Sequence, residues 1–130
     1  MAKYTFEEFM DIIRKLRSRD GCPWDREQTH ESLKSCLLDE CYEVIEAIDN
    51  NDKDNLCEEL GDVLLQVAMH SVIAEETGDF TIDDVIDAEA VKMIRRHPHV
   101  FGDVAVSNSE EVLKNWDEIK ANAQKIWNSI

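Results

Sequence analysis

The chain has 130 residues, 33% of them charged, and a formal net charge of −15 at pH 7. This acidic balance argues against binding along a nucleic-acid duplex, because phosphate backbones are bound by clustered Lys and Arg. Four Gly and two Pro are too few for a turn-rich β fold. The length suits one domain with a substantial core, and we predict a single domain over residues 1–130.

Neither a targeting segment nor a membrane span is expected. The N-terminal residues lack the long apolar core of a signal peptide, and no apolar run approaches transmembrane length. The cysteines form no C-x-x-C pair, which is typical of reduced thiols in the cytosol. We therefore expect a cytoplasmic protein with neither a membrane nor a nucleic acid as partner.

The apolar periodicity predicts helices and no strand. Thr5 is the expected N-cap of the first helix, with Glu8 at capping-box distance. The predicted helices cover residues 5–19, 29–48 and 54–76, a stretch from Thr81 or Asp83 to Arg96, and a last one from Ser109. Loops are predicted at 20–25, 49–54 and 97–107, and Gly78 is expected to end the third helix. The fold class is all-α, a helical bundle built round a central antiparallel helix hairpin.

A twelve-residue pattern occurs twice in the predicted hairpin. It reads LLDECYEVIEAI from Leu37 and LCEELGDVLLQV from Leu56, an offset of nineteen residues. Both the acids and the apolar positions of the first copy coincide with those of the second. The aligned acid pairs are Asp39/Glu58, Glu40/Glu59 and Glu43/Asp62.

This spacing predicts that four carboxylates meet. On a helical wheel, Glu40 and Glu43 border the apolar stripe that we expect to be buried, and the second helix repeats the arrangement. The turn midpoint near Asn51 is equally far from both acid pairs, so antiparallel helices place them at the same height. Such a cluster is costly without a cation, because like charges raise one another's pKa. We predict a site for Mg²⁺ or Mn²⁺; a solvated helix face is the alternative.

Read with their surroundings, these residues resemble the MazG family of nucleoside triphosphate pyrophosphohydrolases. The similar segments are GCPWDREQTHESL at 21–33, LLDECYEVIEAID at 37–49, LCEELGDVLLQVAMH at 56–70, KMIRRHPHVFG at 92–102 and NWDEIKA at 115–121. One departure is Asp39, where the family signature has a Glu. Many MazG proteins carry two tandem domains, whereas this chain has one. The resemblance implies a homodimer or homotetramer.

The resemblance also implies a reaction: hydrolysis of a nucleoside triphosphate to the monophosphate and pyrophosphate, in cleansing of the nucleotide pool. By carry-over Glu40, Glu43, Glu59 and Asp62 hold Mg²⁺, with Mn²⁺ as a possible substitute. Glu43 or Asp39 is the candidate catalytic group that activates the water. The alternative is a non-catalytic nucleotide-sensing or helical interaction module that retains the acidic cluster. A ferritin-like di-metal oxidase is disfavoured, because it needs two Glu-x-x-His motifs.

Further residues are candidates for nucleotide binding: Lys92, Arg95, Arg96, Trp116, Trp24 and His30. In the similar family, the Lys and the second Arg of KMIRR contact the phosphates. The alternative is that these cations only complement a helix C-terminus. Trp116 could stack on the base or belong to the core. Trp24 could close over the base or plug the bundle end, and His30 could contact substrate or make only a polar contact.

Overall fold

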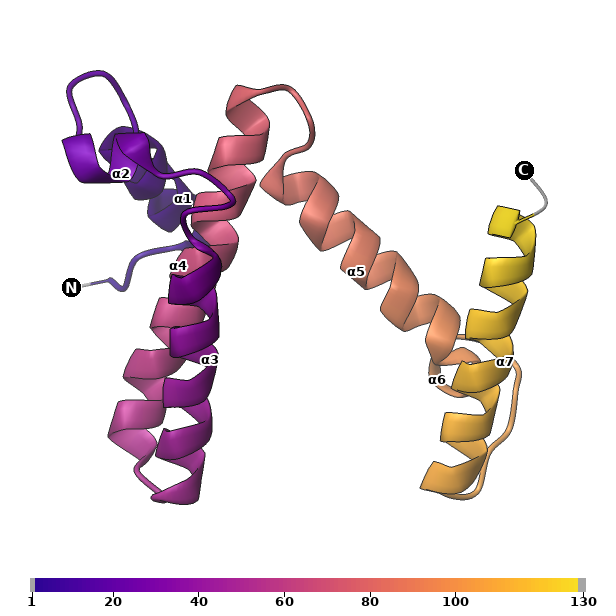
Figure 1. Cartoon of the computed structure of the whole chain (residues 1–130). Helices are drawn as coiled ribbons and strands as arrows, with labels where there is room; N and C mark the ends of the chain where they lie inside the picture. The colour runs from indigo at the N-terminus through magenta and orange to yellow at the C-terminus, as the bar shows by residue number, and fades with distance from the viewer. Residues whose placement is uncertain (1, 129–130) are drawn as a thin grey trace. The chain divides into compact units, whose positions relative to one another are not determined.

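The computed structural model describes residues 2–128, with side chains as far as Ala123, and the chain is helical (Figure 1). The helices are α1 (Phe6–Leu16), α2 (Pro23–Glu27), α3 (Lys34–Asp49), α4 (Lys53–Glu76), α5 (Ile82–Arg96), α6 (Pro98–Phe101) and α7 (Ser109–Asn128). No strand occurs between residues 2 and 128, which confirms the all-α prediction. Within the same range, no helix combines the length and the apolar character that crossing a membrane requires.

The chain divides into two compact units, residues 1–82 and residues 83–130. The first unit contains α1 to α4, and the second contains α6, α7 and all of α5 except its first residue. Each unit is described by itself below. The single domain over residues 1–130 stays a prediction.

Helices α3 and α4 run antiparallel and side by side, which gives the predicted hairpin (Figure 1). The connection is short, and Asn51 within it has a left-handed backbone with φ of 52°. Asp52 caps α4 by accepting a hydrogen bond of 3.1 Å from the backbone N–H of Asn55. Gly78 follows the last turn of α4 with φ of 74°, as expected for a helix stop that favours glycine.

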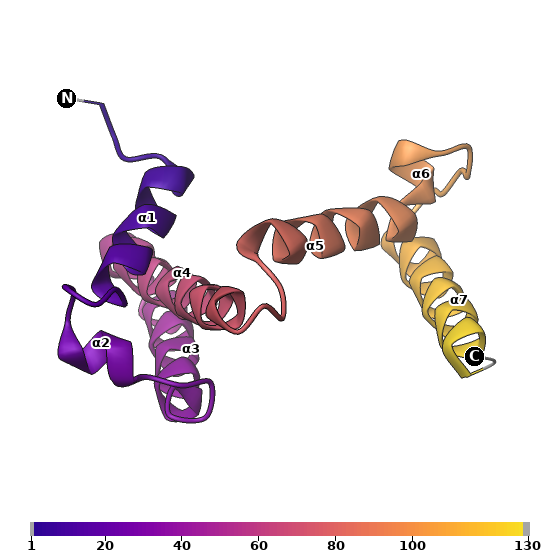
Figure 2. The same ribbon diagram turned by 90° about the horizontal axis from the view of Figure 1, so that it is seen from above.

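The core of the first unit lies where α1 packs against the C-terminal half of α4 (Figures 1 and 2). Met10 and Ile13 of α1 are buried there, as are Met69 and Val72 of α4. The predicted capping box at the start of α1 is present, because Thr5 and Glu8 exchange side-chain to backbone hydrogen bonds. The core therefore fixes α4, and α4 carries one half of the acid repeat.

Arginine side chains fasten α1 to α4. The guanidinium of Arg17 donates to both carboxylate oxygens of Glu76 at 2.8 and 2.9 Å. It also donates to the backbone carbonyls of Asp25 and Gln28 at 2.6 and 3.0 Å. With its side chain only 7% exposed, Arg17 joins α1, the α2 segment and the end of α4.

Two short helices occur where the sequence predicts loops. Helix α2 occupies part of the predicted loop 20–25, and α6 occupies part of the predicted loop 97–107. Both begin with a proline, Pro23 and Pro98. Proline suits the first helical position because the N–H it lacks has no partner there. Reading these prolines only as breakers was wrong.

Helix α3 begins at Lys34, five residues after the predicted start at Thr29. Thr29 and Ser32 exchange hydrogen bonds instead: each backbone N–H donates to the other's side-chain oxygen, at 2.8 and 3.1 Å. Such local bonds compete with helical ones. The residues before α3 are therefore a folded turn (residues 28–33) rather than a first helical turn.

Candidate metal centre

Four carboxylates meet inside the hairpin. Glu40 and Glu43 of α3 and Glu59 and Asp62 of α4 each offer one oxygen, and these four oxygens lie within 4.8 Å of one another. The spacing of three residues within each pair keeps both acids on one side of their helix. The turn sets the two pairs at equal height. The structure therefore brings together the four residues that the sequence predicts, which we call the acid cluster.

The carboxylates of the acid cluster resist ionising together. The pKa of Glu59 is raised from 4.5 to about 7 by a hydrogen bond with Glu43, by burial, and by the charges of Glu43, Asp62 and Glu40. Burial is the largest cause that raises the pKa of Glu40, followed by Glu43, Asp62 and Asp39. The cluster therefore favours a proton or a cation between the helices.

The donor set of the acid cluster fits a hard divalent cation. One buried oxygen each of Glu40 and Glu59 has no hydrogen-bond partner among the described residues. Buried acceptors of this kind are normally satisfied, so these two are placed to take a ligand. All four donors are carboxylate oxygens, which Mg²⁺ and Mn²⁺ accept, and the cluster contains no thiolate or imidazole.

The apolar stripe of the repeat faces outward, contrary to the expectation that it is buried. Helices α3 and α4 touch through the side that carries Glu40 and the buried residues Leu33 and Ala47. The stripe lies to one side of that contact: Val44, Leu56 and Val63 are half-buried, and its other members are exposed. The exposed members are Leu37, Cys41, Ile45 and Ile48 of α3 and Leu60, Leu64 and Val67 of α4. We call this surface the apolar face.

The second unit carries the predicted cations. Lys92 lies 3.5 Å from Glu89 on the same helix, and Arg95 is exposed. Arg96 is half-buried, and its Nε has no hydrogen-bond partner within the part of the chain that the structure describes. A guanidinium N–H left unpaired in this way is available to an anion.

A scan against known families matches residues 28–101 to the MazG nucleotide pyrophosphohydrolase domain. This match covers more than half of the chain. The chain belongs to the MazG family. The matched residues include the whole acid cluster and the KMIRR segment.

Relatives of this MazG chain extend the match to most of its length. A Thermotoga maritima protein named nucleoside triphosphate pyrophosphohydrolase/pyrophosphatase MazG is 59% identical over 120 residues, which are 92% of this chain and 46% of that protein. The Escherichia coli K12 nucleoside triphosphate pyrophosphohydrolase is 44% identical over 126 residues, 95% of this chain and 48% of the other. The Bacillus subtilis protein YabN is 57% identical over 90% of this chain and 24% of its own. The chain thus spans between about a quarter and a half of these relatives.

A solved structure has the same fold as the MazG chain. The crystal structure of a mazG-related protein from Thermotoga maritima aligns with a TM-score of 0.72 and 34% sequence identity. The alignment covers 88% of this chain and 98% of the other. The all-α architecture is therefore shared with a solved relative.

Trp116 lies against the end of α5 in this MazG chain. The ring of His97 meets the indole edge-on with centroids 5.0 Å apart, and His97 is itself held by the carbonyl of Met93 at 2.5 Å. The indole Nε1 is buried without a hydrogen-bond partner among the described residues. Trp116 is thus half-buried and partnered by an aromatic ring, and stacking on a base stays a prediction.

Three other predicted residues lie apart from the acid cluster. Trp24 is 56% exposed, which argues against a plug in the bundle end. Asp39 is exposed, is not a member of the cluster, and acts on it only by raising the pKa of Glu40. His30 is half-buried against His70, a contact that the sequence analysis missed. The positions of both histidines relative to the hairpin turn could have revealed it.

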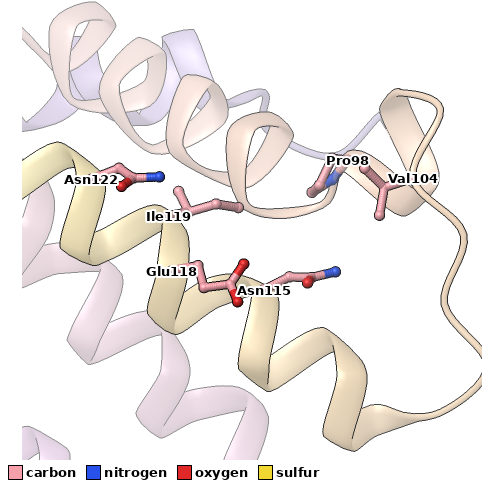
Figure 3. Close-up of a pocket in the computed structure, with 6 residues that line it drawn as sticks. All are labelled: Pro98, Val104, Asn115, Glu118, Ile119 and Asn122. Atoms are coloured by element: carbon pink, nitrogen blue, oxygen red, sulfur yellow. The ribbon is translucent and has the colours of Figure 1, made fainter.

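A cavity of about 190 Å³ lies in the second unit (Figure 3). Its lining comes from one side of α7 and from α6 and the loop that follows α6. The lining residues are Pro98, Val104, Asn115, Glu118, Ile119 and Asn122. This cavity was not predicted from the sequence, although Asn115, Ile119 and Asn122 share the spacing of one helix face.

Proposed function

We propose that this MazG domain hydrolyses nucleoside triphosphates to nucleoside monophosphates and pyrophosphate with a divalent cation, Mg²⁺ foremost, at the acid cluster. The acid cluster carries the proposal, because its raised pKa values and unpartnered oxygens are those of a site built for a cation. The names of the Thermotoga maritima and Escherichia coli relatives support the same reaction. Cleansing of the nucleotide pool in the cytoplasm is the cellular role that we propose.

Each member of the acid cluster has a part in this reaction. Glu40, Glu43, Glu59 and Asp62 would hold the cation, which when bound neutralises the triphosphate and lowers the pKa of a coordinated water. Glu43 is the exposed member, and it raises the pKa of both Glu40 and Glu59. It is therefore our first candidate to take the proton from the attacking water, and Asp39 is the second.

The second unit would supply the groups that bind the nucleotide. Arg96 offers a buried Nε without a hydrogen-bond partner among the described residues, and Lys92 makes a contact of 3.5 Å with Glu89 that a phosphate would replace. Both cations suit phosphate oxygens, with Arg95 beside them in the sequence. Trp116 offers an indole face and an unpartnered Nε1 for the base. Trp24 and His30 stay weaker candidates for base contacts.

We also propose that a second copy of the chain covers the apolar face, which gives a homodimer. With the adjoining Leu38 and Tyr42, the apolar face exposes on the order of 700 Å², more than is usual on a monomer and close to one side of a standard interface. The repeat gives α3 and α4 the same pattern, so the face presents matching rows to another copy of itself. A homotetramer would be a pair of such dimers.

The direct test is pyrophosphate release from a panel of normal and modified nucleoside triphosphates, with Mg²⁺ and with excess EDTA. We expect equimolar monophosphate and pyrophosphate with Mg²⁺ and none with EDTA. Release of single phosphate, or hydrolysis that resists EDTA, would contradict the proposal. Binding of nucleotide without turnover on any member of the panel would favour the sensing module instead.

A further inference from the structure

Two histidines meet at the end of the hairpin that is remote from its turn. The Nδ1 atoms of His30 and His70 lie 2.7 Å apart, and the rings are parallel within 3° with centroids 5.0 Å apart. The contact follows the register of the acid cluster. Glu40 faces Glu59, and His30 and His70 follow ten and eleven residues farther from the turn.

The contact requires a defined arrangement of protons. A distance of 2.7 Å between two ring nitrogens is a hydrogen bond, so one Nδ1 carries a proton and the other accepts it. The Nε2 of His70 is buried without a partner among the described residues. An unsatisfied acceptor is easier to bury than an unsatisfied N–H. His70 is therefore the donor from Nδ1, with a bare Nε2, and His30 is the acceptor.

We infer that His30 and His70 are positioning residues. Their hydrogen bond fixes the turn at residues 28–33, and with it the start of α3, against α4. A further proton that leaves both Nδ1 atoms protonated releases it. The turn is also tied to the first unit by the bond from Arg17 to the carbonyl of Gln28 and by the buried side chain of Leu33. The hairpin is thus fastened by its tight connection at one end and by the histidine pair at the other. Both fastenings keep Glu40 level with Glu59.

The surroundings make the pair sensitive to pH. Of the charged groups close to the histidines in sequence, Glu75 and Glu76 of α4 are bound by Arg14 and Arg17 of α1, while Glu31 and Lys34 are exposed. Burial lowers the pKa of His70 from 6.5, and the charge of His30 lowers it further. Below about pH 6.5, His70 therefore binds a proton less readily in the folded chain than in the unfolded chain. The contribution of His70 to stability declines as pH falls through this range.

The experiment reads the pair in the metal-free full chain, by histidine ¹⁵N NMR and by amide hydrogen exchange of residues 33–37 at pH 8 and pH 5.5. We expect His70 as the Nδ1–H tautomer at pH 8, and faster exchange at pH 5.5 after correction for the intrinsic rate. His70→Phe should raise exchange about tenfold at pH 8, as loss of one hydrogen bond allows. His70→Asn, which keeps a donor at the Nδ1 position but cannot be protonated, should restore protection at both pH values.

The control is His99→Asn in the second unit, which should leave exchange of residues 33–37 unchanged. An Nε2–H tautomer of His70, wild-type protection in His70→Phe, or an equal loss in His99→Asn would each overturn the inference. The consequence for the acid cluster rests on the proposed function and is measured separately, as weaker Mn²⁺ binding by His70→Phe at pH 8. If the wild-type chain binds no Mn²⁺, the metal proposal fails while the exchange data still decide the role of the pair.

Discussion

Glu40 and Glu59 face each other across the α3–α4 hairpin, and each buries one carboxylate oxygen that has no hydrogen-bond partner among the described residues. Helix pairs usually fill such positions with apolar side chains. Here the pKa of both acids is raised, chiefly by Glu43 in the case of Glu59 and chiefly by burial in the case of Glu40. The two carboxylates are stable at this separation only if a proton or a cation lies between them.

The metal-free chain should lose stability as pH rises from the ordinary pKa of a Glu toward the raised pKa of Glu59. That pKa is about 7 in the folded chain against an ordinary 4.5, so between these values the folded chain binds more protons than the unfolded chain. The free energy of unfolding therefore falls across this window, and the loss is complete above it. A cation replaces the proton, so Mg²⁺ should raise the midpoint of thermal unfolding more at pH 8 than at pH 5.5.

Thermal unfolding with and without Mg²⁺ at each pH isolates this effect. The comparison is made in His70→Asn as well as in the wild type, because this variant cannot be protonated at position 70 and so lacks the pH dependence of the histidine pair. An equal shift at both pH values would mean that protons and Mg²⁺ do not compete at the acid cluster.

Glu59→Gln should separate stability from metal binding. The amide removes one of four clustered charges, so the metal-free variant should unfold at a higher temperature than the wild type at pH 8. The same change removes an anionic ligand, so Mn²⁺ affinity should fall at least about tenfold and pyrophosphate release should be lost. The matched control is Glu58→Gln, since Glu58 is exposed and outside the cluster. If both variants bind Mn²⁺ alike, the acid cluster is not the metal site.

Gly21→Ala should destabilise the first unit by about 2 to 3 kcal/mol through overpacking. A Cβ at this position would lie 2.2 Å from the carbonyl oxygen of Lys15 and 2.3 Å from that of Leu16, so the backbone would have to move. Gly61→Ala is the control, because a Cβ there meets nothing within 4 Å and the site lies inside α4. Urea unfolding should show Gly61→Ala as neutral or more stable by up to about 1 kcal/mol. Equal effects would show that packing at Gly21 is not the cause.

Arg17→Ala should lower the free energy of unfolding by about 2 to 3 kcal/mol, because it removes the donor to Glu76 and to the carbonyl of Gln28, and one of two donors to the carbonyl of Asp25. Urea unfolding measures this loss, and the exposed Arg19→Ala serves as control. A double-mutant cycle with Glu76→Ala gives the contribution of the Arg17–Glu76 ion pair to the free energy of unfolding. If Arg17→Ala costs no more than Arg19→Ala, the fastening of α1 to α4 lies elsewhere.

Ile45→Asn should break the proposed dimer. Ile45 is 52% exposed near the middle of the apolar face, where a buried amide without a partner weakens association. Analytical ultracentrifugation should show a dimer for the wild type and a larger monomer fraction for the variant. Glu46→Gln changes the neighbouring exposed residue outside the apolar face and should leave the dimer intact. A wild type that sediments as a monomer, or an Ile45→Asn variant as dimeric as the wild type, would contradict the proposal.

The convergence of the four carboxylates of the acid cluster could be predicted, because it depends only on the spacing of these residues in the sequence. Equal distances of Glu40 and Glu59 from the turn, and a spacing of three within each pair, give the juxtaposition once the hairpin forms. The histidine pair obeys the same counting, so His70 could have been assigned a partner.

The exposure of the apolar face could not be predicted from sequence spacing. A helix with acids beside an apolar stripe can pack through either side, and the choice rests on what else covers the stripe. Ala47 and Leu33 fill the contact in this chain, whereas Ile45 stays exposed. The two proline-initiated helices were also missed, because a proline reads as a breaker or as a first helical residue according to the backbone before it.

The connection between α3 and α4 contains only Asn50, Asn51 and Asp52, and none of them belongs to the acid cluster. A single inserted residue that joined the first turn of α4 would displace Glu59 and Asp62 by about 1.5 Å along the helix axis and by about 100° around it relative to α3. Glu59 and Asp62 would then leave Glu40, and other side chains of α4 would take their places. The length of this connection is thus fixed by the acid cluster two helical turns away, although none of its residues belongs to that cluster. We expect the connection to tolerate substitutions far better than insertions or deletions.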